Sequence, residues 1–111
     1  MLFLSIYTPA GDMSGSPSPE HMAAMGALVE KMTKAGVLVS TGPLGGASQA
    51  LRIARSGSAF DVKDGLDGSG LKEGGYGLLE CRSKEHLIEV AKEFLEIAGD
   101  GECIIRPVTM T

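Results

Sequence analysis

The sequence predicts an α+β fold built from two successive strand–helix–strand units. Two amphipathic segments open with the similar motifs Ser18-Pro19-Glu20-His21-Met22 and Ser83-Lys84-Glu85-His86-Leu87. Each segment lies between two short apolar runs that are rich in strand-favouring residues. A glycine turn at 56–58, flanked by two further strand-like runs, predicts a hairpin. Together these observations predict a ferredoxin-like fold with βαββαβ order and an extra hairpin.

The first predicted strand, Leu2–Tyr7, is an apolar run that only Ser5 interrupts. Such a run is typical of a strand that is covered on both faces. Proline and glycine then predict a loop over 8–17, and a second glycine-rich loop is expected over 64–75. The remaining predicted strands are Val37–Ser40, Tyr76–Cys81 and Glu102–Val108 in the sheet, and Ala50–Arg55 and Ala59–Lys63 in the hairpin.

Both helices have recognisable boundaries. Ser18 is a capping residue, and Pro19 suits the first helical position. The first helix is expected to end at Gly36, and the second is expected to run from Ser83 to Gly99. Residues at three- and four-residue steps predict their apolar faces, which are Met22, Met25, Leu28, Val29 and Met32 in the first helix and Leu87, Val90, Ala91, Phe94 and Ala98 in the second.

The first strand predicts a homodimer. Its side chains Leu2, Leu4 and Ile6 alternate with Phe3 and Tyr7, so both sides of the strand are apolar. Since two helices on one sheet face leave the other face uncovered, that face needs a partner. We therefore expect two copies to pack sheet against sheet, with a small organic molecule bound in a pocket between them.

Composition excludes several classes of function. The chain has 111 residues and a net charge of −4, which predicts a single domain over 1–111 with no basic stripe for nucleic acid or a membrane surface. No apolar run approaches the roughly 20 residues of a membrane span, and the start lacks a basic leader, so a cytoplasmic protein is expected. Two isolated cysteines and two histidines predict neither a metal site nor a cofactor.

The stretch from Asp64 to Glu80 reads DGLDGSGLKEGGYGLLE. It resembles the signature region of the YCII-related proteins of the DGPF type, in which an Asp-Gly-Pro-Phe turn leads through Lys-Glu to Gly-Gly-Tyr and an apolar strand. The motifs at 18–22, 35–39 and 60–65 match the same family, whereas Leu66 and Asp67 replace the Pro and Phe of its turn. The resemblance implies a dimeric α/β barrel in cytoplasmic bacterial proteins, with a pocket at the dimer interface.

The same resemblance suggests site residues. In the enzyme-like branch of the family, a histidine just inside the first helix is proposed as an acid–base residue, and His21 occupies that position. His86 lies at the equivalent turn of the second helix, with no role assigned. The glycine-rich loop allows a ligand to approach the backbone closely, and the candidate ligand-binding residues there are Asp64, Lys72, Glu73 and Tyr76.

Three interpretations follow. The first is a small-molecule-binding protein with weak acid–base chemistry at His21. The second is a non-catalytic accessory protein that binds a transcription regulator through the dimer surface or the Asp64 loop. The third is a purely structural domain whose pocket is filled by side chains. A phosphate loop at 42–48 is disfavoured because it lacks the Lys-Ser/Thr ending, and the glycines of 65–70 do not follow a βαβ start.

Overall fold

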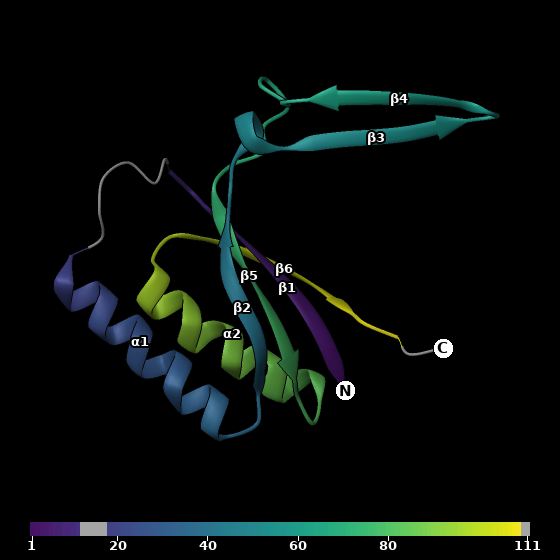
Figure 1. Ribbon diagram of the computed structural model, residues 1–111. Helices are drawn as coiled ribbons and strands as arrows, with labels where there is room; N and C mark the ends of the chain where they lie inside the picture. The colour runs from purple at the N-terminus through teal and green to yellow at the C-terminus, as the bar shows by residue number, and fades with distance from the viewer. Residues whose placement is uncertain (12–17, 110–111) are drawn as a thin grey trace.

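A computed structural model describes residues 1–11 and 18–109, and Figure 1 shows how its elements are arranged. Its elements are, in order, β1 (Leu2–Pro9), α1 (Pro19–Lys34), β2 (Leu38–Leu44), the short 3-10 helix η1 (Ala47–Gln49), β3 (Leu51–Ser56), β4 (Ala59–Asp64), β5 (Gly74–Glu80), α2 (Lys84–Ala98) and β6 (Gly101–Pro107). This order confirms the predicted α+β class, with two strand–helix–strand units and an inserted hairpin.

Four strands form the main sheet in the order β2-β5-β1-β6, and every neighbouring pair is antiparallel. Each helix therefore connects two strands that are separated by one strand between them. This split arrangement is compatible with a ferredoxin-like α+β fold. Strands β3 and β4 form a separate two-stranded sheet.

Each helix begins with a serine cap. The Ser18 Oγ accepts a hydrogen bond of 3.1 Å from the backbone N–H of His21, and the Ser83 Oγ accepts one of 3.1 Å from that of His86. Both bonds satisfy a backbone donor that the first helical turn leaves unpaired. Gly36, just after α1, has a φ of 75°, a conformation that favours glycine. The predicted helix boundaries are confirmed.

One position of the predicted apolar face of α1 is wrong. Met22 is 60% exposed, whereas Leu28 and Met32 are buried. His21 and Met25, which lie seven positions before Leu28 and Met32, are both half-buried. The inward face of α1 therefore starts at His21, because a helical repeat of 3.6 residues turns its neighbour Met22 towards solvent.

The hydrophobic core lies between the two helices and one face of the main sheet (Figure 1). Phe3, Ser5 and Tyr7 of β1 are buried, while Ile6 between them is 37% exposed. Strand alternation therefore directs Phe3, Ser5 and Tyr7 towards the helices and Ile6 towards the opposite face. Phe3 belongs to one cluster of buried residues, whose other members are Leu28, Met32, Val37, Leu79, Cys81, Leu87 and Val90.

Strands β1, β2 and β5 each extend two or more residues beyond their predicted bounds, and β5 begins at Gly74 instead of Tyr76. Thr8 and Pro9 belong to β1, and β2 continues through 41–44 because these residues pair with 74–77 of β5. Glycine and proline in these stretches indicated loops, but backbone pairing with a neighbouring strand holds them in the sheet. The rest of the first predicted loop, at 12–17, lies outside the described residues. Of the helices described, neither has the length and apolar character that crossing a bilayer requires.

Candidate functional site

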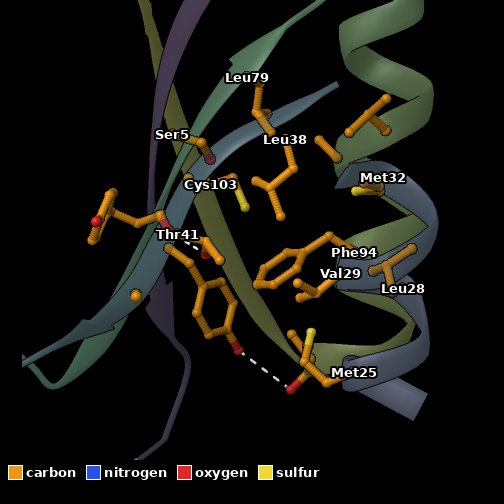
Figure 2. Close-up of a pocket in the computed structure, with 18 of the residues that line it drawn as sticks. Ser5, Met25, Leu28, Val29, Met32, Leu38, Thr41, Leu79, Phe94 and Cys103 are labelled. Carbon is orange, nitrogen blue, oxygen red and sulfur yellow. Dashed lines mark hydrogen bonds between the residues drawn. The ribbon is translucent and has the colours of Figure 1, made fainter. Parts of the chain in front are cut away.

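A cavity of about 340 Å³ lies between the main sheet and its own two helices. Figure 2 shows Met25 and Val29 of α1 and Phe94 of α2 facing Leu38 and Thr41 of β2 across this space. The cavity lining is mainly apolar. The sequence predicted a pocket between two paired sheets, whereas this cavity lies on the helix side of one sheet.

Glycines of β5 leave the space that forms the cavity. Gly75 lies opposite Tyr7, and Gly77 lies opposite Ser5, so both glycines are on the helix side of the sheet. A Cβ atom on Gly77 would lie 3.7 Å from Leu79 Cδ2 and 3.9 Å from Leu38 Cδ1, which are ordinary contact distances. A side chain at Gly77 would therefore fit, and its absence leaves part of the core unfilled.

Several polar side chains that line the cavity bind protein atoms. The Thr41 hydroxyl donates a hydrogen bond of 2.7 Å to the backbone carbonyl of Tyr76. The Tyr7 hydroxyl lies 3.5 Å from the Ala98 carbonyl oxygen and 3.4 Å from that of Asp100, and donates to them. These hydroxyls are therefore engaged by the fold.

Two ionisable groups of the lining have altered acidities. Burial raises the pKa of the Tyr7 phenol above its ordinary value, and the nearby Cys103 and Asp100 act in the same direction. Burial also raises the pKa of the Cys103 thiol. A hydrogen bond with Ser5 lowers this pKa and so offsets part of the increase. Both groups are thus neutral near pH 7, and Cys103 is not an activated thiolate.

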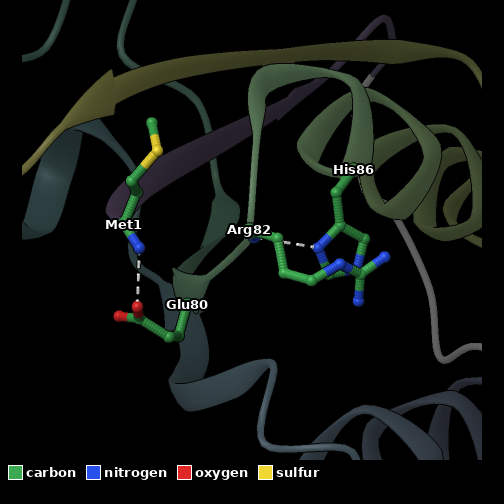
Figure 3. Close-up of polar contacts among 4 residues, drawn as sticks. All are labelled: Met1, Glu80, Arg82 and His86. Atoms are coloured by element: carbon green, nitrogen blue, oxygen red, sulfur yellow. Dashed lines mark hydrogen bonds and ion pairs between the residues drawn. The ribbon is translucent and has the colours of Figure 1, made fainter.

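The two histidines occupy similar positions in their helices but have different surroundings. His21 lines the cavity from the first turn of α1 and is half-buried. His86 instead accepts a hydrogen bond of 3.1 Å at Nδ1 from the backbone N–H of Arg82 (Figure 3). The imidazole of His86 therefore stabilises the turn that leads into α2, whereas His21 is a residue of the cavity lining.

Tyr76 borders the cavity, but its ring lies on the other face of the sheet. Its hydroxyl oxygen is 2.9 Å from Ser40 Oγ, and its Cε1 atom lies 3.1 Å from the position of a Cβ on Gly42. Its partner across the strand pair is Ile6, whose side chain points away from the helices. Tyr76 and His21 thus direct their side chains to opposite faces of the sheet.

The structure does not bring the charged candidates to the cavity. Asp64, at the end of β4, is exposed, as are Lys72 and Glu73 before β5. None of the three is among the residues that line the cavity. Lys72 Nζ instead donates a hydrogen bond of 3.3 Å to the carbonyl of Ala10. Their role in ligand binding stays a prediction. Within 1–11 and 18–109, no three His, Cys, Asp or Glu side chains cluster as a metal site requires.

Sequence reasoning missed Ser5, Tyr7, Thr41 and Cys103 as residues of the cavity. The sequence held a signal for Ser5 and one for the glycines of β5. Ser5 is a small polar residue in an apolar strand, and Gly75 and Gly77 are two residues apart, so they share one strand face. Neither signal indicates which face the helices cover. A comparison with models of protein families and one with curated proteins found no match to the chain.

Proposed function

We propose that the protein binds a small, mainly apolar molecule in the cavity between sheet and helices, and that His21 exchanges a proton with it. The observation that carries this proposal is that His21 is among the residues that line a largely apolar cavity of about 340 Å³. This volume is near the lower end of the range of about 300–1,000 Å³ for small-molecule sites. The resemblance to the YCII-related proteins adds support, since it implies an acid–base histidine at this position.

The lining defines the chemistry of the ligand. Met25, Val29 and Phe94 offer apolar contact to a ring or a short aliphatic chain. Because the hydroxyls of Tyr7 and Thr41 already donate to backbone carbonyls, they can only accept from a ligand, whereas the His21 ring has both a donor and an acceptor nitrogen in its neutral form. The expected ligand therefore has an apolar body and one ionisable or hydrogen-bonding group.

The proposal includes assembly of two copies through the face of the main sheet that carries no helix. Ile6 of β1 lies opposite Ile104 of β6 on this face, and Ile104 is 56% exposed. Leu4 and Leu78, which also lie opposite each other, continue the same surface. Contact between two such faces removes apolar area from water, and it would give the dimeric α/β barrel that the motif resemblance implies.

Binding can be tested with 4-nitrophenol, a small aromatic probe whose absorbance reports its own ionisation. We expect Gly77→Val to weaken probe binding at least about tenfold, because the new side chain enters the cavity. Gly26→Ala is the matched control, since a Cβ on Gly26 meets no atom within 4 Å. Equal affinity of the wild type and Gly77→Val would rule out this cavity as the binding site.

Proton exchange needs a separate measurement. The absorbance of the bound probe is recorded against pH for the wild type and for His21→Gln. A proton shared with His21 makes ionisation of the bound probe depend on the imidazole, so the two titration curves should differ. Identical curves would remove His21 from the chemistry and leave binding intact.

A further inference from the structure

Strands β3 and β4 form a hairpin, called the arm below, that lies apart from the main sheet. In the part of the chain that the structure describes, the two strands pair with each other and with no strand of the main sheet. Figure 1 shows the arm projecting from the ends of β2 and β5, on the side away from both helices. The radius of gyration is 16.1 Å, whereas a compact chain of about 100 residues has one of about 13 Å.

The two faces of the arm differ in chemistry. Ile53 lies opposite Val62, and Phe60 lies opposite Arg55, so these four residues share one face. On the other face, Arg52 forms an ion pair of 3.2 Å with Asp61. The apolar face carries four side chains that are 56–68% exposed, which are Leu51, Ile53, Phe60 and Val62.

The exposed apolar face needs a cover. A two-stranded hairpin on its own is at best marginally stable in water, because it has no second layer to pack against. We propose that the apolar face of the arm packs on a second copy of this chain, so that the arms help to hold two copies together. This inference rests on the homodimer included in the proposed function.

Charge favours a second copy as the occupant. The arm, residues 51–64, has three basic and two acidic residues, whereas the rest of the chain has seven basic and twelve acidic residues. The arm of one copy is therefore attracted to the body of another. Two arms are equivalent by symmetry, so each copy both gives and receives this contact.

The area that a stable interface must bury also favours a second copy of this chain as the partner of the arm. A stable interface buries about 800 Å² on each partner, which is large for one face of a four-stranded sheet. Because the arm projects on the side of the sheet that lacks helices, a copy packed on that side meets both surfaces (Figure 1). The sheet face and the arm together form one larger, continuous contact.

The double variant Ile53→Thr/Val62→Thr tests the proposal. Threonine keeps a β-branched side chain in both strands but makes the apolar face polar. The matched control Ala54→Thr/Ala59→Thr changes two residues of the opposite face, with the same net charge. We expect sedimentation equilibrium to give a dimer dissociation constant at least about tenfold higher for the first variant and unchanged for the control.

A mixture of ¹³C-labelled and unlabelled copies gives an independent readout. In an isotope-filtered NOE experiment, the methyl groups of Ile53 and Val62 should show contacts to protons of the unlabelled copy. A dimer that keeps its affinity in Ile53→Thr/Val62→Thr and lacks these contacts would overturn the role of the arm and leave assembly through the sheet in place. A wild type that stays monomeric would overturn both, whereas binding of 4-nitrophenol in the cavity is measured separately.

Discussion

Ser5 of β1 lies directly opposite Gly77 of β5, on the side of the sheet that faces the helices. A small side chain thus faces a position with no side chain in the middle of the sheet. Gly75 lies opposite Tyr7 two residues away, so the bare stretch continues along β5. The cavity between sheet and helices follows from this pairing. Gly75 and Gly77 of β5 carry no side chain that could fill the space between the sheet and the helices.

Filling this space should stabilise the free protein. A glycine inside a strand costs about 0.5–1 kcal/mol relative to alanine, and each buried methylene contributes about 0.8 kcal/mol. We therefore expect Gly77→Val to raise the free energy of unfolding by about 2 kcal/mol, measured by urea denaturation without ligand. A clear loss of stability would mean that the residues around Gly77 leave no room for a side chain.

The two serine caps should contribute about equally. Ser18→Ala and Ser83→Ala each remove the acceptor for a backbone N–H at a helix start, which costs about 1 kcal/mol. Thermal and urea unfolding would measure the loss. Ser18→Asp and Ser83→Asp serve as controls, because aspartate also caps helices and should keep most of the stability. Alanine variants as stable as the wild type would contradict the capping geometry.

Replacing His86 should affect mainly the stability of the fold, whereas replacing His21 should affect mainly probe binding. His86→Ala removes the acceptor for the backbone N–H of Arg82 and is expected to lower the free energy of unfolding by about 1 kcal/mol. It should leave the affinity for 4-nitrophenol unchanged, because His86 does not line the cavity. His21→Gln should show the reverse pattern, with altered probe binding and a smaller change in stability. The same pattern in both variants would contradict the distinction drawn between them.

Alkaline pH should destabilise the fold through its thiols. Burial raises the pKa values of Cys81 and Cys103 above their ordinary value of 9.0, so the folded state favours the neutral thiol. The unfolded chain ionises first as the pH rises, so the thiol contribution is complete below pH 9.0 and is lost as the pH rises through the higher values of the folded state.

The wild type should therefore lose more stability than Cys81→Ala/Cys103→Ala between pH values of about 7.5 and 10, measured with a reductant present. Comparing the two losses cancels the titration of other groups. Parallel pH profiles for the two proteins would show that neither thiol is protected by the fold.

Local signals in the sequence predict most of the fold. Ser18, Ser83, Gly36 and Gly99 mark the helix ends, because capping and positive φ angles depend on residues close in the chain. The turn at Gly57, with a φ of 61°, is equally local. The extension of β2 through Gly42 was missed, because it depends on pairing with β5, more than thirty residues away in the sequence.

The site was harder to predict than the fold. His21 could be selected from its place in α1, but the other elements that line the cavity are β1, β2, β5, α2 and β6, so no spacing along the chain reveals the site. The register turns the Tyr76 side chain to the face without helices, towards Ser40, and its predicted role in ligand binding stays a prediction. A strand side chain changes face with a shift of one residue, and the sequence around Gly74 does not set that register.

The cavity lies on the helix side of the main sheet, opposite the face proposed for assembly. The proposal therefore predicts one ligand for every chain. If the proposed dimer is diluted until its copies separate, the binding isotherm should stay in place, because ligand binding and assembly use opposite faces of the sheet.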